Sequence, residues 1–140
     1  MTNLKNIFVA LDGSKHSSKA LDYAIYLARQ SQGTITGVFV IPLFSVNVVK
    51  PTSKLGQIFA ENGKKILSEA KLRCARNGVV FYEKILCGNE GFKLVSLAKD
   101  RKANLIIMGS RGRSNIKEFF LGSVSHYVAH KSPIPVLIVK

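Results

Sequence analysis

Residues 105–112 read LIIMGSRG, an apolar run that stops abruptly at two closely spaced glycines. The apolar residues at 105–108 are typical of a strand that is buried on both faces of a sheet. Gly109 and Gly112 indicate a turn, because glycine adopts backbone conformations that other residues rarely reach. Apolar residues at helical spacing follow at about residues 122–131. This part of the chain therefore predicts a buried strand, a glycine-rich loop and a helix, in that order.

The same alternation of strand and helix recurs before and after this unit. Near the start of the chain an apolar run ends at Asp12-Gly13-Ser14, and apolar residues at helical spacing follow it as far as Gly33. The predicted strands occupy residues 6–11, 34–41, 79–86, 105–108 and 133–139. The predicted helices occupy about residues 15–32, 55–74, a short stretch through 94–98, and 122–131, while residues 43–54 form a loop without a clear period.

This alternation favours a parallel sheet with helices on both faces, because each right-handed crossover lays a helix against the sheet. We therefore predict the α/β class: a single doubly wound, open, parallel five-stranded sheet in a Rossmann-like or flavodoxin-like three-layer sandwich. Ligands of such sheets bind at the carboxyl ends of the strands, where the strand order reverses. The loops after the first and fourth predicted strands are thus the candidate binding loops.

Length and composition indicate one globular domain. The chain has 140 residues, of which 46% are hydrophobic, so we expect residues 1–140 to form one domain that buries a core without disulfides or metals. No apolar run approaches the ~20 residues of a membrane helix, and the first strand begins too early for a signal peptide. Cys74 and Cys87 form no C-x-x-C pattern and are expected to be reduced. We therefore expect a cytoplasmic protein that does not bind membranes.

The glycine-rich loop has the features of a phosphate site. Its pattern is Gly109-x2-Gly112-x9-Gly122-Ser123, in which glycines allow the backbone to approach an anion closely. A helix that begins near Gly122 directs unpaired N–H groups and the positive end of its dipole toward the same place. Glycines also serve ordinary strand-to-helix turns, and that purely structural interpretation is the alternative. Side chains expected to assist an anion are Ser123, Ser125, Arg111 and Arg113.

Asp12 follows the first predicted strand and faces the glycine-rich loop if the first and fourth strands are neighbours. A carboxylate at this place accepts hydrogen bonds from ribose hydroxyls or holds a phosphate-bound Mg²⁺ ion. Asp12 is therefore also the candidate metal-binding residue. Its alternative role is to cap the first helix.

Taken together, these residues resemble the universal stress protein family, specifically its ATP-binding branch. The resemblance covers essentially the whole chain and rests on four blocks: Ile7–Ser14, Leu105–Gly112, Leu121–Val124 and Pro135–Val139. Every position of the G-x2-G-x9-G-[S/T] pattern, which that family uses to hold ATP phosphates, is present here. The resemblance implies a strand order of 3-2-1-4-5 and a homodimer formed through the last strand, residues 135–139. An apolar edge strand of this kind is one that proteins usually cover or pair.

The resemblance also implies which residues bind the nucleotide. The ligand is implied to be ATP, ADP or AMP, with or without Mg²⁺. The residues implied to surround the phosphates are Gly109, Gly112, Gly122, Ser123 and Val124. The residues implied to hold the adenosine are Ala10 and Asp12, and those implied to line the adenine pocket are Val40 and Met108. Leu11 is a further implied nucleotide-binding residue.

No residue pattern identifies a catalytic centre. His126 and His130 are spaced like a helical metal pair, but the sequence offers them neither an intervening Glu nor a third ligand. His16 is a lone histidine at a helix start. Without an identifiable base or arginine finger, ATP hydrolysis is expected to be slow at most. We therefore expect a binding module that acts in stress response or regulation through nucleotide occupancy, with protein partners that the sequence does not name.

The net charge supports one rival hypothesis. Lys and Arg number 21 against 8 Asp and Glu, a formal charge of +13 at pH 7, which attracts nucleotides, nucleic acids and acidic membranes alike. The alternative function is a basic nucleic-acid-binding domain of α/β fold without specific ATP binding. The basic residues are spread along the chain, however, and an RNA-binding sheet needs an open face with interleaved aromatic and basic residues. Nucleic acid is therefore not the expected partner, although the charge does not exclude it.

Overall fold

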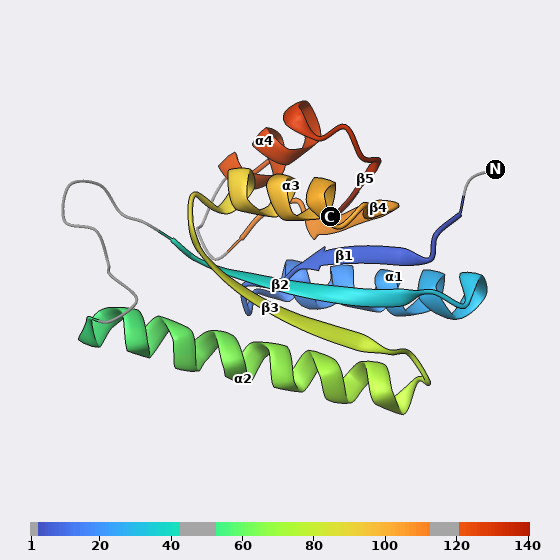
Figure 1. The fold of residues 1–140 in the computed structure, drawn as a ribbon, viewed down its shortest axis with the longest axis horizontal. Coiled ribbons are helices and arrows are strands. Elements are labelled where there is room, and N and C mark those ends of the chain that lie inside the picture. Colours follow the sequence, from blue (N-terminus) through green and yellow to red (C-terminus); the bar gives the residue numbers. More distant parts are fainter. Residues whose placement is uncertain (1–2, 43–52, 113–120) are drawn as a thin grey trace.

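The computed structural model describes residues 3–42, 53–112 and 121–140. Strands and helices alternate through these residues (Figure 1). Their bounds are β1 (Asn6–Ala10), α1 (Lys15–Ser31), β2 (Thr34–Pro42), α2 (Lys54–Arg76), β3 (Phe81–Gly88), α3 (Glu90–Asp100), β4 (Leu105–Gly109), α4 (Ser123–Lys131) and β5 (Val136–Val139). Most of the loop predicted at residues 43–54, and Arg113 as well, lie outside the described residues.

The strands of the sheet are parallel and lie in the order β3-β2-β1-β4-β5. The predicted five-stranded parallel sheet and its strand order are thus confirmed. β1 lies at the centre, where Phe8 is level with Thr36 of β2 and with Ile106 of β4. The strand order reverses between β1 and β4. The carboxyl ends of these two strands therefore form the crevice in which ligands of such sheets bind.

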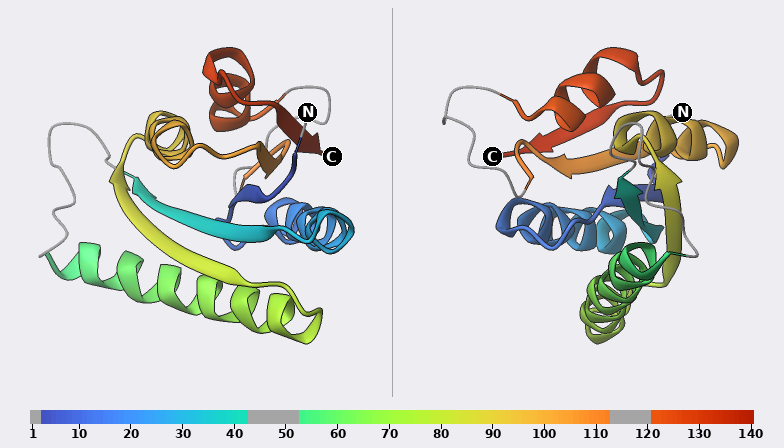
Figure 2. Two further views of the ribbon diagram at one scale, coloured as in Figure 1. Left: turned by 45° about the vertical axis from the view of Figure 1, so that its right-hand side comes forward. Right: turned by 90° about the vertical axis from the view of Figure 1, so that its left-hand side faces the viewer.

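Helices cover both faces of the sheet, which gives three layers (Figure 2). One apolar core lies beneath α1 and α2 and includes Leu21 and Leu67, while a second lies beneath α3 and α4 and includes Leu94. β1 contributes Ile7 to the first core and Phe8 to the second, because successive side chains of a strand point to opposite faces. In the described parts of the chain, no helix is both long enough and apolar enough to span a membrane.

Three helices begin with a side-chain cap. The side chains of Ser14, Ser53 and Asn89 accept hydrogen bonds from backbone N–H groups in the first turns of α1, α2 and α3. Such a cap typically contributes about 1 kcal/mol to stability. Helix α4 begins differently, because its N-cap is Gly122 and no side chain forms a cap hydrogen bond there. The first N–H groups of α4 are therefore left for solvent or a ligand.

The third strand lies further along the chain than predicted. The prediction placed it at residues 79–86, whereas β3 begins at Phe81 and ends at Gly88. The N–H of Val79 donates to the carbonyl of Cys74 at 2.9 Å, which keeps Val79 in the turn that ends α2. The apolar character of Val79 reflects burial in that turn rather than a place in the strand.

The last strand is shorter than predicted. The prediction placed it at residues 133–139, whereas β5 begins at Val136. The hydroxyl of Ser132 accepts a hydrogen bond from the N–H of Ile134 and donates one to its carbonyl, which holds this segment in a turn. The first strand also ends one residue early, although the N–H of Leu11 still donates to Val38 of β2 at 2.9 Å.

Candidate functional site

A cavity of about 480 Å³ opens at the carboxyl ends of β1, β2 and β4. This place is the crevice where the strand order reverses. Apart from Arg113, every residue that the sequence suggested for the nucleotide site lines this cavity. These residues are Ala10, Leu11, Asp12, Val40, Met108, Gly109, Arg111, Gly112, Gly122, Ser123, Val124 and Ser125. Segments that are far apart in the sequence thus meet at one concave surface.

One wall of the cavity is apolar. It is formed by Val38 and Val40 of β2, Leu94 of α3 and Met108 of β4. Val38, Leu94 and Met108 belong to the buried core beneath α3 and α4. Because a packed core holds these side chains in place, the wall is preformed for an apolar ring.

The glycine-rich loop leaves β4 and is joined to the start of α4. The N–H of Gly122 donates to the carbonyl of Ser110 at 2.7 Å, and the hydroxyl of Ser125 donates to the same carbonyl at 2.8 Å. These bonds place the amino end of α4 beside Gly109 and Gly112 in the cavity. The first N–H groups of α4, which no side chain caps, are therefore available to an anion at this place.

The two serines of α4 differ in what they offer. Ser123 is exposed at the cavity, so its hydroxyl is accessible to a ligand. Ser125 is buried, and its hydroxyl lies 2.8 Å from the carbonyl of Ser110 and 3.0 Å from that of Gly122. The hydroxyl of Ser125, which we expected to assist an anion, is thus used within the fold. Its backbone N–H remains as its contribution to the first turn of α4.

Positions 109 and 112 need a glycine for different reasons. A Cβ at Gly109 would lie 2.6 Å from Cβ of His16, so the missing side chain lets the first turn of α1 pack against β4. A Cβ at Gly112 would lie 2.8 Å from Oδ2 of Asp12, at the cavity itself. Gly109 is therefore required by packing, whereas Gly112 leaves room around a carboxylate of the site.

Asp12 connects the loop after β1 to the glycine-rich loop. Its Oδ1 accepts a hydrogen bond from the N–H of Ser14 at 2.8 Å, and its Oδ2 faces Gly112. Ser14 is the residue that caps α1, so the alternative role of Asp12 as the helix cap is wrong. The carboxylate is held by its own turn and directed toward the cavity.

Glu90 is a second carboxyl group in the cavity and is not among the residues predicted for the site. It is half-buried and is the first residue of α3, directly after the carboxyl end of β3. Burial raises the pKa of Glu90, and the negative charge of Asp12 raises that pKa further. The negative charge of Asp12 therefore acts on Glu90 within the same cavity. The position of Glu90 after a strand was the signal that could have identified it.

Other lining residues carry no local signal. Phe59 and Asn62 of α2 reach the cavity only because α2 packs across β2. Their spacing along α2 does not distinguish them from other helix residues, so the sequence did not identify them as site residues. The further lining residues that were not predicted for the site are Ser17, Val38, Phe39, Pro42 and Leu94.

Among the residues that the structure describes, the histidines of α4 are not part of a metal-binding cluster. His126 and His130 are exposed, and their rings stack with centroids 6.1 Å apart. Across residues 3–42, 53–112 and 121–140, no group of three or more His, Cys, Asp or Glu side chains is arranged to hold a metal ion. Asp12 therefore remains a predicted ligand of a nucleotide-bound ion, and Glu90 is a second carboxyl group in the same cavity.

Comparisons of the sequence and of the structure with known proteins point to the same protein family. The model of the universal stress protein family matches residues 3–140. Universal stress protein YxiE of Bacillus subtilis is 35% identical over 150 residues, a match that covers 96% of this chain and 97% of YxiE.

Solved structures share the fold over nearly the full chain. The structure of hypothetical protein MJ0577, a universal stress protein of Methanocaldococcus jannaschii, superposes with a TM-score of 0.89 at 29% identity and covers 98% of this chain and 96% of its own. A universal stress protein solved in complex with cAMP superposes with a TM-score of 0.77 at 30% identity, covering 97% of each chain. The chain therefore belongs to the universal stress protein family.

Proposed function

We propose that this protein binds an adenine nucleotide, ATP, ADP or AMP, in the cavity between the loops after β1 and β4. The observation that carries the proposal is the meeting of three surfaces in one cavity: an apolar wall, two carboxyl groups, and a glycine-rich loop beside an uncapped helix start. These surfaces suit the base, the sugar and the phosphates of a nucleotide. The relative solved with cAMP supports an adenine nucleotide as the ligand class.

Each surface has its own role in the proposed complex. Val40 and Met108 contact the adenine, and Ala10 and Leu11 border the nucleoside. Asp12 accepts hydrogen bonds from ribose hydroxyls and is the carboxylate available to a phosphate-bound Mg²⁺ ion. The residues proposed to contact the phosphates are Gly109, Arg111, Gly112, Gly122, Ser123, Val124 and Ser125. Backbone N–H groups and the helix dipole stabilise the phosphate charge.

Occupancy is the proposed output of this site. A bound nucleotide completes the hydrogen bonds of the α4 start and joins the loops after β1 and β4, so it stabilises one arrangement of this end of the sheet. In the proposed role, a partner protein in the cytoplasm distinguishes the occupied from the empty form during stress response or regulation. The proposed functional form is a homodimer that pairs through β5, an apolar strand at the edge of the sheet.

Calorimetric titration of nucleotide-free protein tests the proposal. Mg-ATP, ADP and AMP are titrated separately at about 150 mM salt, where the general positive field contributes little. Each titration is repeated with EDTA to measure the part played by Mg²⁺. Inorganic triphosphate is the control for attraction by charge alone. We expect one site per chain for an adenine nucleotide and weaker binding of triphosphate. Equal binding of triphosphate, or no adenine nucleotide binding, would overturn the proposal.

A further inference from the structure

A second cavity shares no lining residue with the proposed nucleotide site. It has a volume of about 290 Å³ and lies between α1 and α2. Its lining residues are Asp22, Ile25, Tyr26 and Arg29 from α1, and Arg73, Arg76 and Asn77 from the end of α2. None of them lines the first cavity. We call this cavity the arginine cleft.

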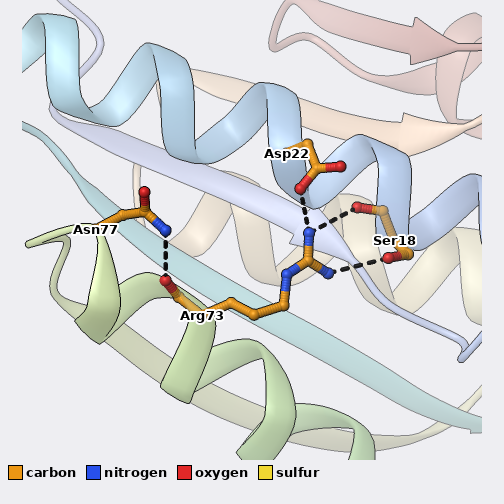
Figure 3. Close-up of polar contacts among 4 residues, drawn as sticks. All are labelled: Ser18, Asp22, Arg73 and Asn77. Carbon is orange, nitrogen blue, oxygen red and sulfur yellow. Dashed lines mark hydrogen bonds and ion pairs between the residues drawn. The ribbon is translucent and has the colours of Figure 1, made fainter.

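Arg73 fixes the shape of the arginine cleft. Its guanidinium donates to the carboxylate of Asp22 and to the hydroxyl of Ser18, the latter at 3.0 Å, so it ties α2 to α1 (Figure 3). The amide of Asn77 donates to the carbonyl of Arg73 at 2.8 Å, which closes the turn at the end of α2. The bridge across the two helices holds the walls of the cleft in place without a ligand.

The cleft carries excess positive charge. Three guanidinium groups line it, and Asp22 is its one carboxylate. Asp22 is engaged by Arg73. Arg29 and Arg76 are exposed, and neither guanidinium forms a hydrogen bond or ion pair with another residue of the described ranges. Two guanidiniums are therefore available to an anion at this place, and guanidinium geometry suits phosphate oxygens.

An exposed aromatic ring accompanies these cations. Tyr26 is 62% exposed and precedes Arg29 by one helical turn on the same wall of the cleft. Arginines at a helix end also stabilise the helix dipole, and that role alone would explain Arg29 and Arg76. It does not explain an exposed tyrosine beside them. A ring for stacking together with cations for the backbone is the combination by which proteins bind single-stranded nucleic acid.

Basic residues continue beyond the cleft. Lys5 donates to the carbonyl of Ser31 at the end of α1, and the amide of Asn6 donates to the carbonyl of Arg101 at the end of α3. All three cations are exposed at the amino edge of the sheet: Lys5 lies beside the end of α1, whereas Arg101 and Lys102 follow α3 on the other face. A chain of phosphates that leaves the cleft would therefore meet further cations, whereas a single small anion would use only the cleft. The continuation favours a polymer, in agreement with the net charge of +13.

We propose that the arginine cleft binds single-stranded nucleic acid, with a phosphate between Arg29 and Arg76 and a base stacked on Tyr26. The sequence spoke against nucleic-acid binding on an open face of the sheet. The arginine cleft is a different surface, because it lies between two helices. The proposal does not depend on nucleotide binding in the first cavity, because the two cavities share no residue.

Fluorescence anisotropy with a labelled single-stranded RNA of about 12 nucleotides, at about 150 mM salt, tests the proposal. The charge variant combines Arg29→Gln with Arg76→Gln, and its matched control combines Lys131→Gln with Lys140→Gln, two exposed positions outside both cavities. We expect the charge variant to bind at least about tenfold more weakly than its control and to have a shallower salt dependence. Tyr26→Ala should weaken binding at least about fivefold, and Tyr26→Phe should restore it.

Several results would overturn the proposal. An equal loss in the charge variant and its control would mean attraction by net charge alone. No binding of wild-type protein at this salt, or equal affinity for a duplex of the same length, would exclude the proposed ligand. Displacement of the RNA by micromolar pyrophosphate would indicate a site for small anions instead. A lower Tm of the charge variant with unchanged RNA affinity would assign the arginines to helix stabilisation.

Discussion

Gly112 and Asp12 meet across the mouth of the proposed nucleotide site: a Cβ on Gly112 would lie 2.8 Å from Oδ2 of Asp12. The loop after β4 thus approaches the loop after β1 without a side chain between them. Because the nearest atom is the end of a flexible carboxylate rather than backbone, a small side chain at position 112 would displace the carboxylate and leave the fold unchanged.

Gly112→Ala is therefore expected to weaken ATP binding about tenfold, a loss of about 1.4 kcal/mol, without lowering Tm. Gly112→Val should weaken it further, because a branched side chain also enters the space for the phosphates. Calorimetry measures the affinities. In an Asp12→Ala background, Gly112→Ala should cost much less, since the displaced group is already absent. Full additivity of the two changes would contradict this account.

Glu90 predicts a pH dependence of stability. Burial and the charge of Asp12 raise the pKa of Glu90 above its ordinary value of 4.5, so the folded state binds this proton more tightly than the unfolded state. The free energy of unfolding should therefore fall as the pH rises from about 4.5 through the folded pKa. Glu90→Gln should be more stable than wild type at pH 7, and the difference should vanish below pH 4.5.

Urea unfolding at several pH values measures this difference. Glu69→Gln, at an exposed position of α2, removes the same charge outside the cavity and should lack the pH-dependent gain. A wild-type protein that is more stable than Glu90→Gln at pH 7 would show that the carboxylate is stabilised rather than strained.

Cys74 and Cys87 should differ in reactivity. Burial raises the pKa of Cys74 to about 11, although the nearby charge of Arg73 lowers it in part. Cys74 is also fully buried, whereas Cys87 is half-buried. At pH 8 a disulfide reagent should therefore label Cys87 first and Cys74 only as the protein unfolds. Single-thiol variants, Cys74→Ala and Cys87→Ala, separate the two rates, and rapid labelling of folded Cys87→Ala would contradict the prediction.

The packing of α2 on β2 leaves no room for a side chain at Gly63. A Cβ at Gly63 would lie 2.5 Å from Cδ1 of Phe39, a buried ring of β2. Alanine favours a helix over glycine by about 1 kcal/mol, but overpacking a core costs about 1–3 kcal/mol. Gly63→Ala should thus lower the free energy of unfolding in urea. The smaller side chain of Phe39→Leu should recover much of the loss in the double variant, and a stabilised single variant would disprove the clash.

The outward backbone groups of β5 show which substitution would disrupt a dimer that pairs through this strand. The carbonyls of Pro135 and Val139 accept hydrogen bonds from Ile106 and Ser110, so the backbone groups of Ile138 face away from β4. Ile138→Pro removes an outward N–H and should convert a dimer joined through β5 into a monomer. Light scattering at micromolar concentration measures the mass, with Ile138→Val as the control. A monomeric wild type, or a dimeric proline variant, would remove this interface.

Local patterns in the sequence were enough for the sheet and for most of the proposed site. Continuous apolar runs marked the buried strands, and their alternation with helices predicted a parallel sheet, whereas the strand order came from the family resemblance. The glycine spacing after β4 identified residues that line one cavity with Asp12. These signals work because the physical requirement, a buried strand or a backbone turn, acts on neighbouring residues.

What the sequence did not reveal depends on packing between distant segments. Phe59 and Asn62 reach the cavity through the docking of α2 on β2, and Glu90 gains its raised pKa only from its surroundings in the fold. The hydroxyl of Ser125 was expected to assist an anion, but it donates to Ser110 across the base of the loop. A residue type indicates what a group can do, whereas the fold decides which partner it has.

The first turn of α4 has no side-chain cap for its backbone N–H groups. The other three helices complete their first turns with a serine or an asparagine, and α4 presents bare amide groups at the mouth of the cavity. A phosphate at this place would act as the missing capping residue. Ligand binding and helix formation would then be one event, and amide hydrogen exchange at the first turn of α4 would register it.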